Sequence, residues 1–217
     1  MAWRLLMRRC PAKSMTLVGD IAQTGSAAGA HSWAEVLDPY VEGRWRLTEL
    51  TVNYRTPAQV MTLASAMLEA AGVPATAPRS VRDGDVPPTA HRIQPGDVDA
   101  IVALVRAEVD ELGEGRLAVI APVDQVGALQ LALSASLPAG MVATGTGALD
   151  APVGVLAVSQ VKGLEFDSVV LIEPARILAA SARGANDLYV ALTRPTQRLR
   201  VVHSGPLPAG LETILEI

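Results

Sequence analysis

The sequence predicts an α/β fold: a parallel sheet with helices on both of its faces. Segments with a helical period of apolar residues alternate with short β-branched segments along most of the chain, and this order is typical of parallel sheets. Residues 153–158 and 168–172 are almost entirely apolar, as expected of central strands that are buried on both sides. Half of the 217 residues are hydrophobic, which is enough to build the core of one such domain.

In the first part of the chain, capping residues set the expected helix boundaries. Ser32 and Glu35 have the spacing of a capping box, so a helix should begin after Ser32. Pro57 suits the first turn of a helix, and Gly72 suits the position after its end. In chain order we expect an amphipathic helix at residues 3–8, a buried strand at 15–18, the helix after Ser32, a strand at 47–52 and a helix from Pro57 to about Ala71.

The second part of the chain begins with a loop-rich segment, since residues 72–96 are rich in Pro, Gly and Asp. Val98, Ile101 and Val105 then follow the helical period, and Gly113 closes that helix. In chain order we expect a helix at 97–112, a strand at 116–121, a helix at 124–137, a loose stretch at 138–152, strands at 153–158 and 168–172, a helix at 186–193 and a strand at 199–202. Ligands of such folds bind at the carboxyl ends of the strands, so we expect the functional loops there.

Charge and cysteine content restrict the class of protein. The net charge is −4 and the pI is about 5.4, whereas domains that hold nucleic acid on their own are usually basic. Cys10 is the only cysteine, so we expect a reduced, cytoplasmic protein without an internal disulfide. No apolar run is long enough to cross a membrane, and the three histidines lack the spacing of metal ligands. The Ala-, Gly- and Arg-rich composition suggests a bacterial genome of high GC content.

Four short segments occur in an order that is more specific than any one of them. They are residues 17–23 (LVGDIAQ), 50–57 (LTVNYRTP), 161–167 (VKGLEFD) and 188–194 (LYVALTR). In this order they resemble motifs III, IV, V and VI of UvrD/Rep-type superfamily 1 DNA helicases. The resemblance implies a RecA-like fold of the P-loop NTPase kind. It also implies that residues 1–49 are the tail of a first RecA-like domain and that residues 50–217 form the second.

The resemblance assigns catalytic roles to three residues. Gln23 resembles the glutamine that positions the attacking water and senses the γ-phosphate of ATP. Arg55 and Arg194 resemble the two arginines that reach the γ-phosphate from the second domain. A planar guanidinium can bind phosphoryl oxygens through two hydrogen bonds, and such an arginine finger contributes on the order of 10³–10⁵ in rate. Outside these motifs, an arginine is usually solvated and a loop glutamine is usually a plain surface residue.

Three further residues are implied in nucleotide binding. Tyr54 resembles the residue that stacks on the adenine, and a buried core tyrosine is the alternative. Glu165 resembles the carboxylate near the ribose, and a surface glutamate at the start of a strand is the alternative. Gly163 belongs to the same Lys-Gly-Leu-Glu-Phe segment as Glu165.

Two motifs that bind ATP and Mg²⁺ directly do not occur in the sequence. No segment has the P-loop pattern G-x-x-x-x-G-K-[ST], and no Asp-Glu pair follows a strand ahead of Gly19. In the helicase family both lie upstream of motif III, so we expect the chain to begin just after the Walker B strand. ATP and Mg²⁺ would then be held mainly by the missing N-terminal RecA-like domain. This chain alone should not hydrolyse ATP.

Departures from the family pattern indicate HelD-like proteins. Residues 24–30 lack the aromatic side chain that stacks on a base in typical DNA helicases. Ala157 and Ser159 stand where the family has a Thr and a His that commonly face the nucleic-acid strand. The segment between Arg55 and Lys162 is too short for a large inserted domain. The ATP-facing residues are kept while the DNA-facing ones are weakened, and HelD-like factors act on RNA polymerase.

Three functions stay open at this point. The first is an ATP-dependent helicase or translocase that moves on DNA, to which this chain alone would bind weakly. The second is a HelD-like factor that remodels RNA polymerase, and the third is a non-catalytic interaction module derived from a helicase. DNA would stimulate the intact ATPase in the first case and RNA polymerase in the second. A P-loop encoded upstream in the same reading frame would exclude the third.

Overall fold

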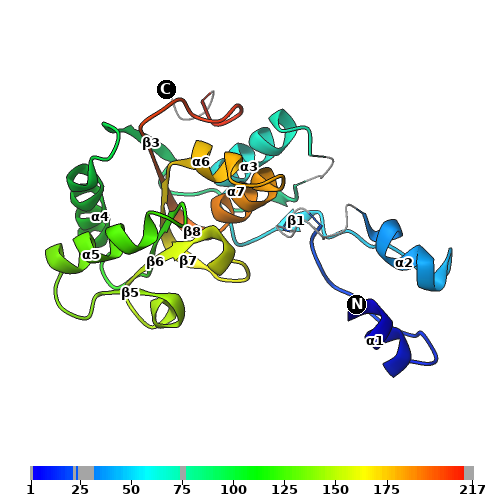
Figure 1. Ribbon diagram of the computed structural model, residues 1–217. Coiled ribbons are helices and arrows are strands. Elements are labelled where there is room, and N and C mark those ends of the chain that lie inside the picture. Colours follow the sequence, from blue (N-terminus) through cyan, green and yellow to red (C-terminus); the bar gives the residue numbers. More distant parts are fainter. Residues whose placement is uncertain (1, 22, 24–31, 74–76, 213–217) are drawn as a thin grey trace.

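The computed structural model describes residues 2–21, 23, 32–73 and 77–212 (Figure 1). Its centre is a six-stranded sheet in the order β3-β8-β7-β4-β6-β5, and every neighbouring pair is parallel. The strands are β3 (Thr89–Arg92), β4 (Leu117–Ala121), β5 (Val142–Thr144), β6 (Val153–Ala157), β7 (Phe166–Ile172) and β8 (Pro195–His203). A separate parallel pair is formed by β1 (Val52–Asn53) and β2 (Arg79–Ser80).

Helices lie on both faces of the six-stranded sheet, so the predicted fold class is confirmed (Figure 1). One face is covered by α4 (Val98–Leu112) and α5 (Val126–Ser136), and the other by α3 (Ala58–Ala70), α6 (Pro174–Ala179) and α7 (Gly184–Leu192). The short 3-10 helices η1 (Gly145–Leu149) and η2 (Val158–Gln160) follow β5 and β6. The N-terminal helices α1 (Ala2–Arg9) and α2 (Trp33–Val41) lie apart from the sheet. No helix within the described ranges is long and apolar enough to cross a membrane.

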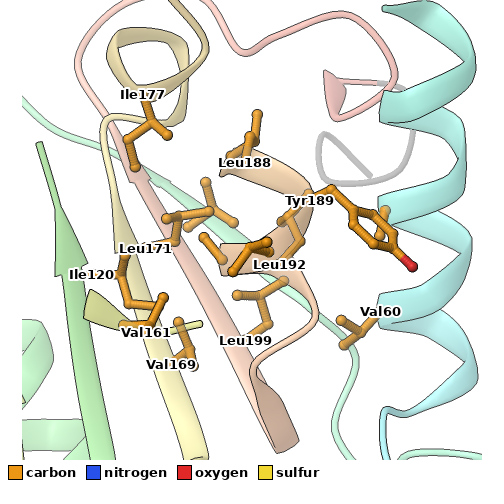
Figure 2. Packing of buried hydrophobic residues seen from close by; sticks show 14 of the residues in the cluster. Val60, Ile120, Val161, Val169, Leu171, Ile177, Leu188, Tyr189, Leu192 and Leu199 are labelled. Carbon is orange, nitrogen blue, oxygen red and sulfur yellow. The ribbon is translucent and has the colours of Figure 1, made fainter. Parts of the chain in front are cut away.

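The core consists of two apolar layers, because alternate residues of a strand point to opposite faces of the sheet. In β4, Ala118 and Ile120 belong to the layer under α3 and α7, whereas Leu117 and Val119 belong to the layer under α4 and α5. Figure 2 shows the first layer, in which side chains of α7 lie between the strands and Val60 of α3. This packing of α7 between the sheet and α3 determines where the chain emerges from the end of α7.

Helix boundaries agree closely with the capping residues. The Ser32 hydroxyl accepts a hydrogen bond of 3.1 Å from the backbone N–H of Glu35 at the start of α2. Asp97 accepts one of 3.0 Å from the N–H of Ala100 at the start of α4. The position after α4 has a φ of 66°, and the residue there is Gly113, which adopts such a value without strain.

Two predicted strands are wrong. Residues 15–18 form no strand, and Val18 is 91% exposed. Of residues 47–52, only Val52 belongs to a strand, and Leu50 is 83% exposed. An apolar, β-branched segment becomes a strand where a neighbouring strand satisfies its backbone groups. The described part of the chain places no strand beside residues 15–18.

The structure contains short elements that the sequence patterns did not predict. The segment 72–96, expected to be loop-rich, contains β2 and β3, and the stretch 138–152 contains β5 and η1. Helix α6 follows β7 without having been expected. Strands β2, β3 and β5 have two to four residues each, which is too short for an alternation of apolar and polar residues to be recognised.

Candidate functional site

Glu165 and Arg194 lie at the amino ends of two neighbouring strands. Glu165 directly precedes β7, and Arg194 directly precedes β8. The prediction that these residues lie at the carboxyl ends of the strands is therefore wrong. The loop after η2 takes the chain from the carboxyl end of β6 to the amino end of β7, and α6 and α7 return it from the end of β7 to the start of β8. Both motifs thus finish at the edge of the sheet opposite to the expected one.

Arg55 lies in a turn that follows β1. Asn53 organises this turn, because its Oδ1 atom accepts hydrogen bonds from the backbone N–H groups of Arg55 (2.8 Å) and Thr56 (3.2 Å). The buried hydroxyl of Thr56 donates a hydrogen bond of 3.4 Å to the carbonyl oxygen of Thr193. This bond joins the Asn-Tyr-Arg-Thr turn directly to the end of α7.

Arg55 and Glu165 form an ion pair. The distance between Arg55 Nη1 and Glu165 Oε1 is 2.5 Å, and the side chains are 36% and 49% exposed. The Nε atom of Arg55 is buried and has no hydrogen-bond partner among the residues that the structure describes. A guanidinium group carries five N–H donors, so Arg55 has donor capacity that these residues leave unused.

Arg194 is buried, with an exposed fraction of 1%. Its Nε atom donates a hydrogen bond to the carbonyl oxygen of Val190 (2.9 Å), and its Nη1 atom donates one to that of Leu164 (3.0 Å). Burial, and after it the positive charge of Arg55, lowers the pKa of Arg194 from its ordinary value of 12.5 to about 10. The guanidinium therefore remains a cation at neutral pH, and it lies next to the Arg55–Glu165 pair.

Tyr54 is 73% exposed, which excludes the alternative of a core tyrosine. It is the residue before Arg55, so an aromatic ring and a guanidinium are presented by the same turn. Gly163 has a φ of 80°, a conformation that residues with a Cβ atom rarely adopt. It lies in the loop before β7, two residues ahead of Glu165.

Gln23 and Asp20 bring the first motif to the same region. Gln23 Nε2 donates a hydrogen bond of 2.9 Å to Asp20 Oδ2. Burial, and after it the negative charge of Asp20, raises the pKa of the Tyr189 phenol to about 12. The charge of Asp20 also acts on Arg194. Residues from all four motif segments are therefore neighbours around the end of α7.

One arginine of this region, Arg82, could not be predicted from the sequence. Its Nη1 atom donates a hydrogen bond of 3.1 Å to the backbone carbonyl oxygen of Arg55, and its own carbonyl accepts one of 2.8 Å from the N–H of Ala58. Arg82 reaches the turn because it follows β2, which pairs with β1. It lies in the segment 72–96, where no motif or periodicity could have indicated it.

The side chains present fit a polyphosphate but not a metal ion. Arg55, Arg82 and Arg194 supply positive charge in one region, and guanidinium groups match phosphoryl oxygens in geometry. Among the residues that the structure describes, no group of three His, Cys, Asp or Glu side chains could hold a metal ion. The described residues therefore offer no site that fits Mg²⁺ by themselves.

The sheet, with two motif arginines gathered at one edge, defines a RecA-like domain of the helicase type. Residues 3–203 match the family described as the viral superfamily 1 RNA helicase core domain. The match spans most of the chain, and the protein belongs to this family. No curated protein matches the chain.

Solved structures resemble the fold. One is the C-terminal domain of a possible DNA helicase from Lactobacillus plantarum WCFS1, with 23% identity and a TM-score of 0.55 over 75% of this chain and 94% of that chain. At this identity the likeness shows the fold alone. A second is the SWI2/SNF2 ATPase core of Sulfolobus solfataricus in complex with dsDNA, with 15% identity and a TM-score of 0.42 over 75% of this chain and 35% of that chain. A likeness of that degree carries no argument about function.

Proposed function

We propose that residues 50–217 are the second RecA-like domain of a superfamily 1 ATP-dependent motor and that residues 1–49 belong to the first. Membership of the helicase core family supports the class of motor. The arrangement of the elements supports the division, since the described residues ahead of β1 contribute no strand to the six-stranded sheet and α1 and α2 lie apart from it.

The nucleotide assignment depends on one observation, which is that Arg55 and Arg194 lie close together. They belong to separate motifs, yet one hydrogen bond joins Thr56 to Thr193, the residues beside them. We assign both arginines to the γ-phosphate of ATP. Arg55 is partly exposed and can contact a phosphate as it stands. Arg194 must first release the carbonyl oxygen of Leu164, because it is buried.

The remaining assignments follow from position and exposure. The exposed ring of Tyr54 would stack on the adenine of the same ATP molecule whose γ-phosphate Arg55 contacts. Glu165 would accept a hydrogen bond from a ribose hydroxyl, and Gly163 gives its loop the required backbone conformation. Gln23 would orient the attacking water from the first domain. The P-loop and the groups that bind Mg²⁺ would come from a preceding domain, because the sequence has no P-loop pattern and the described residues offer no metal site.

We propose RNA polymerase as the partner of the motor, in the manner of HelD-like factors. The net charge of −4 and the residues Ala157 and Ser159 in motif V support a protein partner over a nucleic-acid track. The alternative is a helicase or translocase that acts on DNA or RNA, which the family description favours. A non-catalytic interaction module is the third candidate.

One set of assays separates these functions. We expect no ATP hydrolysis by this chain alone, and hydrolysis once it is joined to the P-loop domain encoded upstream. Arg55→Lys should then reduce kcat by on the order of 10³-fold or more. RNA polymerase should stimulate the joined protein, whereas single-stranded DNA or RNA at physiological salt should not. Stimulation by nucleic acid alone would establish the helicase instead, and the lack of an upstream P-loop would establish the non-catalytic module.

A further inference from the structure

Glu165 is the carboxylate that contacts Arg55, a partly exposed arginine of the candidate site. The pair joins two segments that are 110 residues apart, the turn after β1 and the loop before β7. Arg194 lies close enough for the charges of Arg55 and Glu165 to act on its guanidinium. Arg55 therefore contacts this carboxylate, and the buried guanidinium of Arg194 lies near the pair.

The contact can be exchanged for another anion. Both side chains of the pair are partly exposed, at 36% and 49%, and ion pairs of this kind contribute little to stability. A polyphosphate carries more negative charge than a carboxylate and can accept two parallel hydrogen bonds from one guanidinium. Within the described part of the chain, nothing pairs with the buried Nε atom of Arg55, so a bidentate anion can satisfy this donor once the guanidinium turns away from Glu165.

We propose that Glu165 is an internal competitor of the nucleotide phosphate, which holds Arg55 until a phosphate displaces it. The identity of the competing ligand rests on the proposed function. The exchange couples two contacts of one nucleotide. The phosphate binds Arg55, and the released carboxylate of Glu165 can then accept a hydrogen bond from a ribose hydroxyl. Glu165 thus acts as a positioning residue that keeps Arg55 paired in the absence of nucleotide.

The test measures binding of tripolyphosphate to the 217-residue chain by titration calorimetry. Glu165→Gln keeps the shape of the side chain and removes its charge, and we expect it to tighten binding about threefold to fivefold, as the loss of one exposed ion pair allows. Arg55→Ala should weaken binding and should remove the effect of Glu165→Gln in the double variant. The Nε resonance of Arg55 should shift on addition of tripolyphosphate to the wild-type chain.

A matched control separates competition from a change in net charge. Glu111 pairs with Arg198 at 2.5 Å and is 57% exposed, so Glu111→Gln removes a comparable ion pair elsewhere on the chain. We expect no change in tripolyphosphate affinity for this variant. Thermal unfolding of each variant verifies that it is folded, and Glu165→Asp, which keeps the charge, should bind no more tightly than the wild type.

The outcomes distinguish this inference from the proposed function. Glu165→Gln binding no more tightly than wild type, or an equal gain in Glu111→Gln or in the Arg55→Ala background, would overturn the inference. If Arg55→Ala weakens binding but Glu165→Gln does not strengthen it, Arg55 remains the phosphate ligand and only the competition is refuted. If the competition is observed but the joined ATPase does not need Arg55, the proposed function fails and the exchange stands.

Discussion

The Nη1 atom of Arg194 donates a hydrogen bond of 3.0 Å to the backbone carbonyl oxygen of Leu164. This bond links Arg194, two residues after the end of α7, to the loop that presents Glu165. Together with the bond from Nε to Val190, it makes the guanidinium part of the interior of the domain. Arg194 therefore stabilises the folded domain before any ligand binds. Arg55, which is partly exposed, does not stabilise the interior in this way.

We predict that Arg194→Ala destabilises the chain and that Arg55→Ala does not. Removing the Arg194 guanidinium takes a donor from the carbonyl groups of Val190 and Leu164 and from the hydroxyl of Thr193, so the free energy of unfolding should fall by about 3 kcal/mol. Arg55 is partly exposed, and its loss should cost less than about 1 kcal/mol. Urea denaturation of the two variants measures the difference. Equal stabilities would show that the internal bonds of Arg194 contribute nothing.

The fold could be predicted where a local physical cause acts alone. The side-chain hydrogen bond of Asp97 and the positive φ of Gly113 determine the ends of α4 through local interactions, and α4 has nearly the expected bounds. Residues 15–18 show the opposite case. Their apolar, β-branched composition is suited to a strand, but pairing depends on a partner strand, and none of the described strands lies beside them.

The sequence predicts which residues form the candidate site, but it does not predict at which end of the strands the site lies. The motif pattern identified Arg55, Glu165 and Arg194, and the structure brings them together. Their position at the amino ends of β7 and β8 depends on how two connections cross the sheet, which residue spacing does not encode. Arg82 was missed for a similar reason, because the pairing of β2 with β1 alone brings it to the turn.

We predict that Gly184→Ala strongly destabilises the domain. Gly184 begins α7, and a Cβ atom there would stand 1.8 Å from the carbonyl oxygen of Leu178. Relieving this overlap requires α7 to move against α6, so a loss of about 3 kcal/mol or more is expected in urea denaturation. Gly127, in α5, is the matched control, since nothing lies within 4 Å of its added Cβ. Gly127→Ala should increase stability by about 0.5–1 kcal/mol.

A buried carboxylate, Glu108, predicts a dependence of stability on pH. Glu108 is 3% exposed, receives a hydrogen bond of 2.7 Å from Ser168, and pairs with Arg200 at 2.8 Å. Burial alone would raise its pKa, but the hydrogen bonds from Arg200 and Ser168 and the charges of Arg200 and Arg198 outweigh burial and lower it below the ordinary 4.5. The folded chain therefore binds fewer protons than the unfolded chain in this window, and stability falls as the pH drops from about 4.5 through the folded pKa.

Glu108→Gln tests this dependence. At pH 7 the variant leaves Arg200 without its buried counter-charge, so we expect the free energy of unfolding to fall by about 3 kcal/mol. The difference from wild type should shrink as the pH falls from about 4.5 through the folded pKa of Glu108, because the wild type then loses the stabilisation that the ionised carboxylate gives. Glu111→Gln, which changes an exposed partner of Arg198, should lose less than about 1 kcal/mol. A difference between wild type and Glu108→Gln that is constant from pH 7 to pH 3 would contradict the assignment of the pKa.

The last prediction concerns Tyr54, whose ring is 73% exposed beside Arg55. If the ring stacks on the adenine, Tyr54→Ala should weaken ATP binding by the protein joined to its P-loop domain by about 1–3 kcal/mol. Its affinity for tripolyphosphate, which has no base, should not change. Tyr54→Phe keeps the aromatic face and should bind ATP like the wild type. Because the side chain buries little surface in this chain, neither variant should alter its unfolding temperature. Loss of ATP and tripolyphosphate affinity together would instead place Tyr54 as a support for the Arg55 turn.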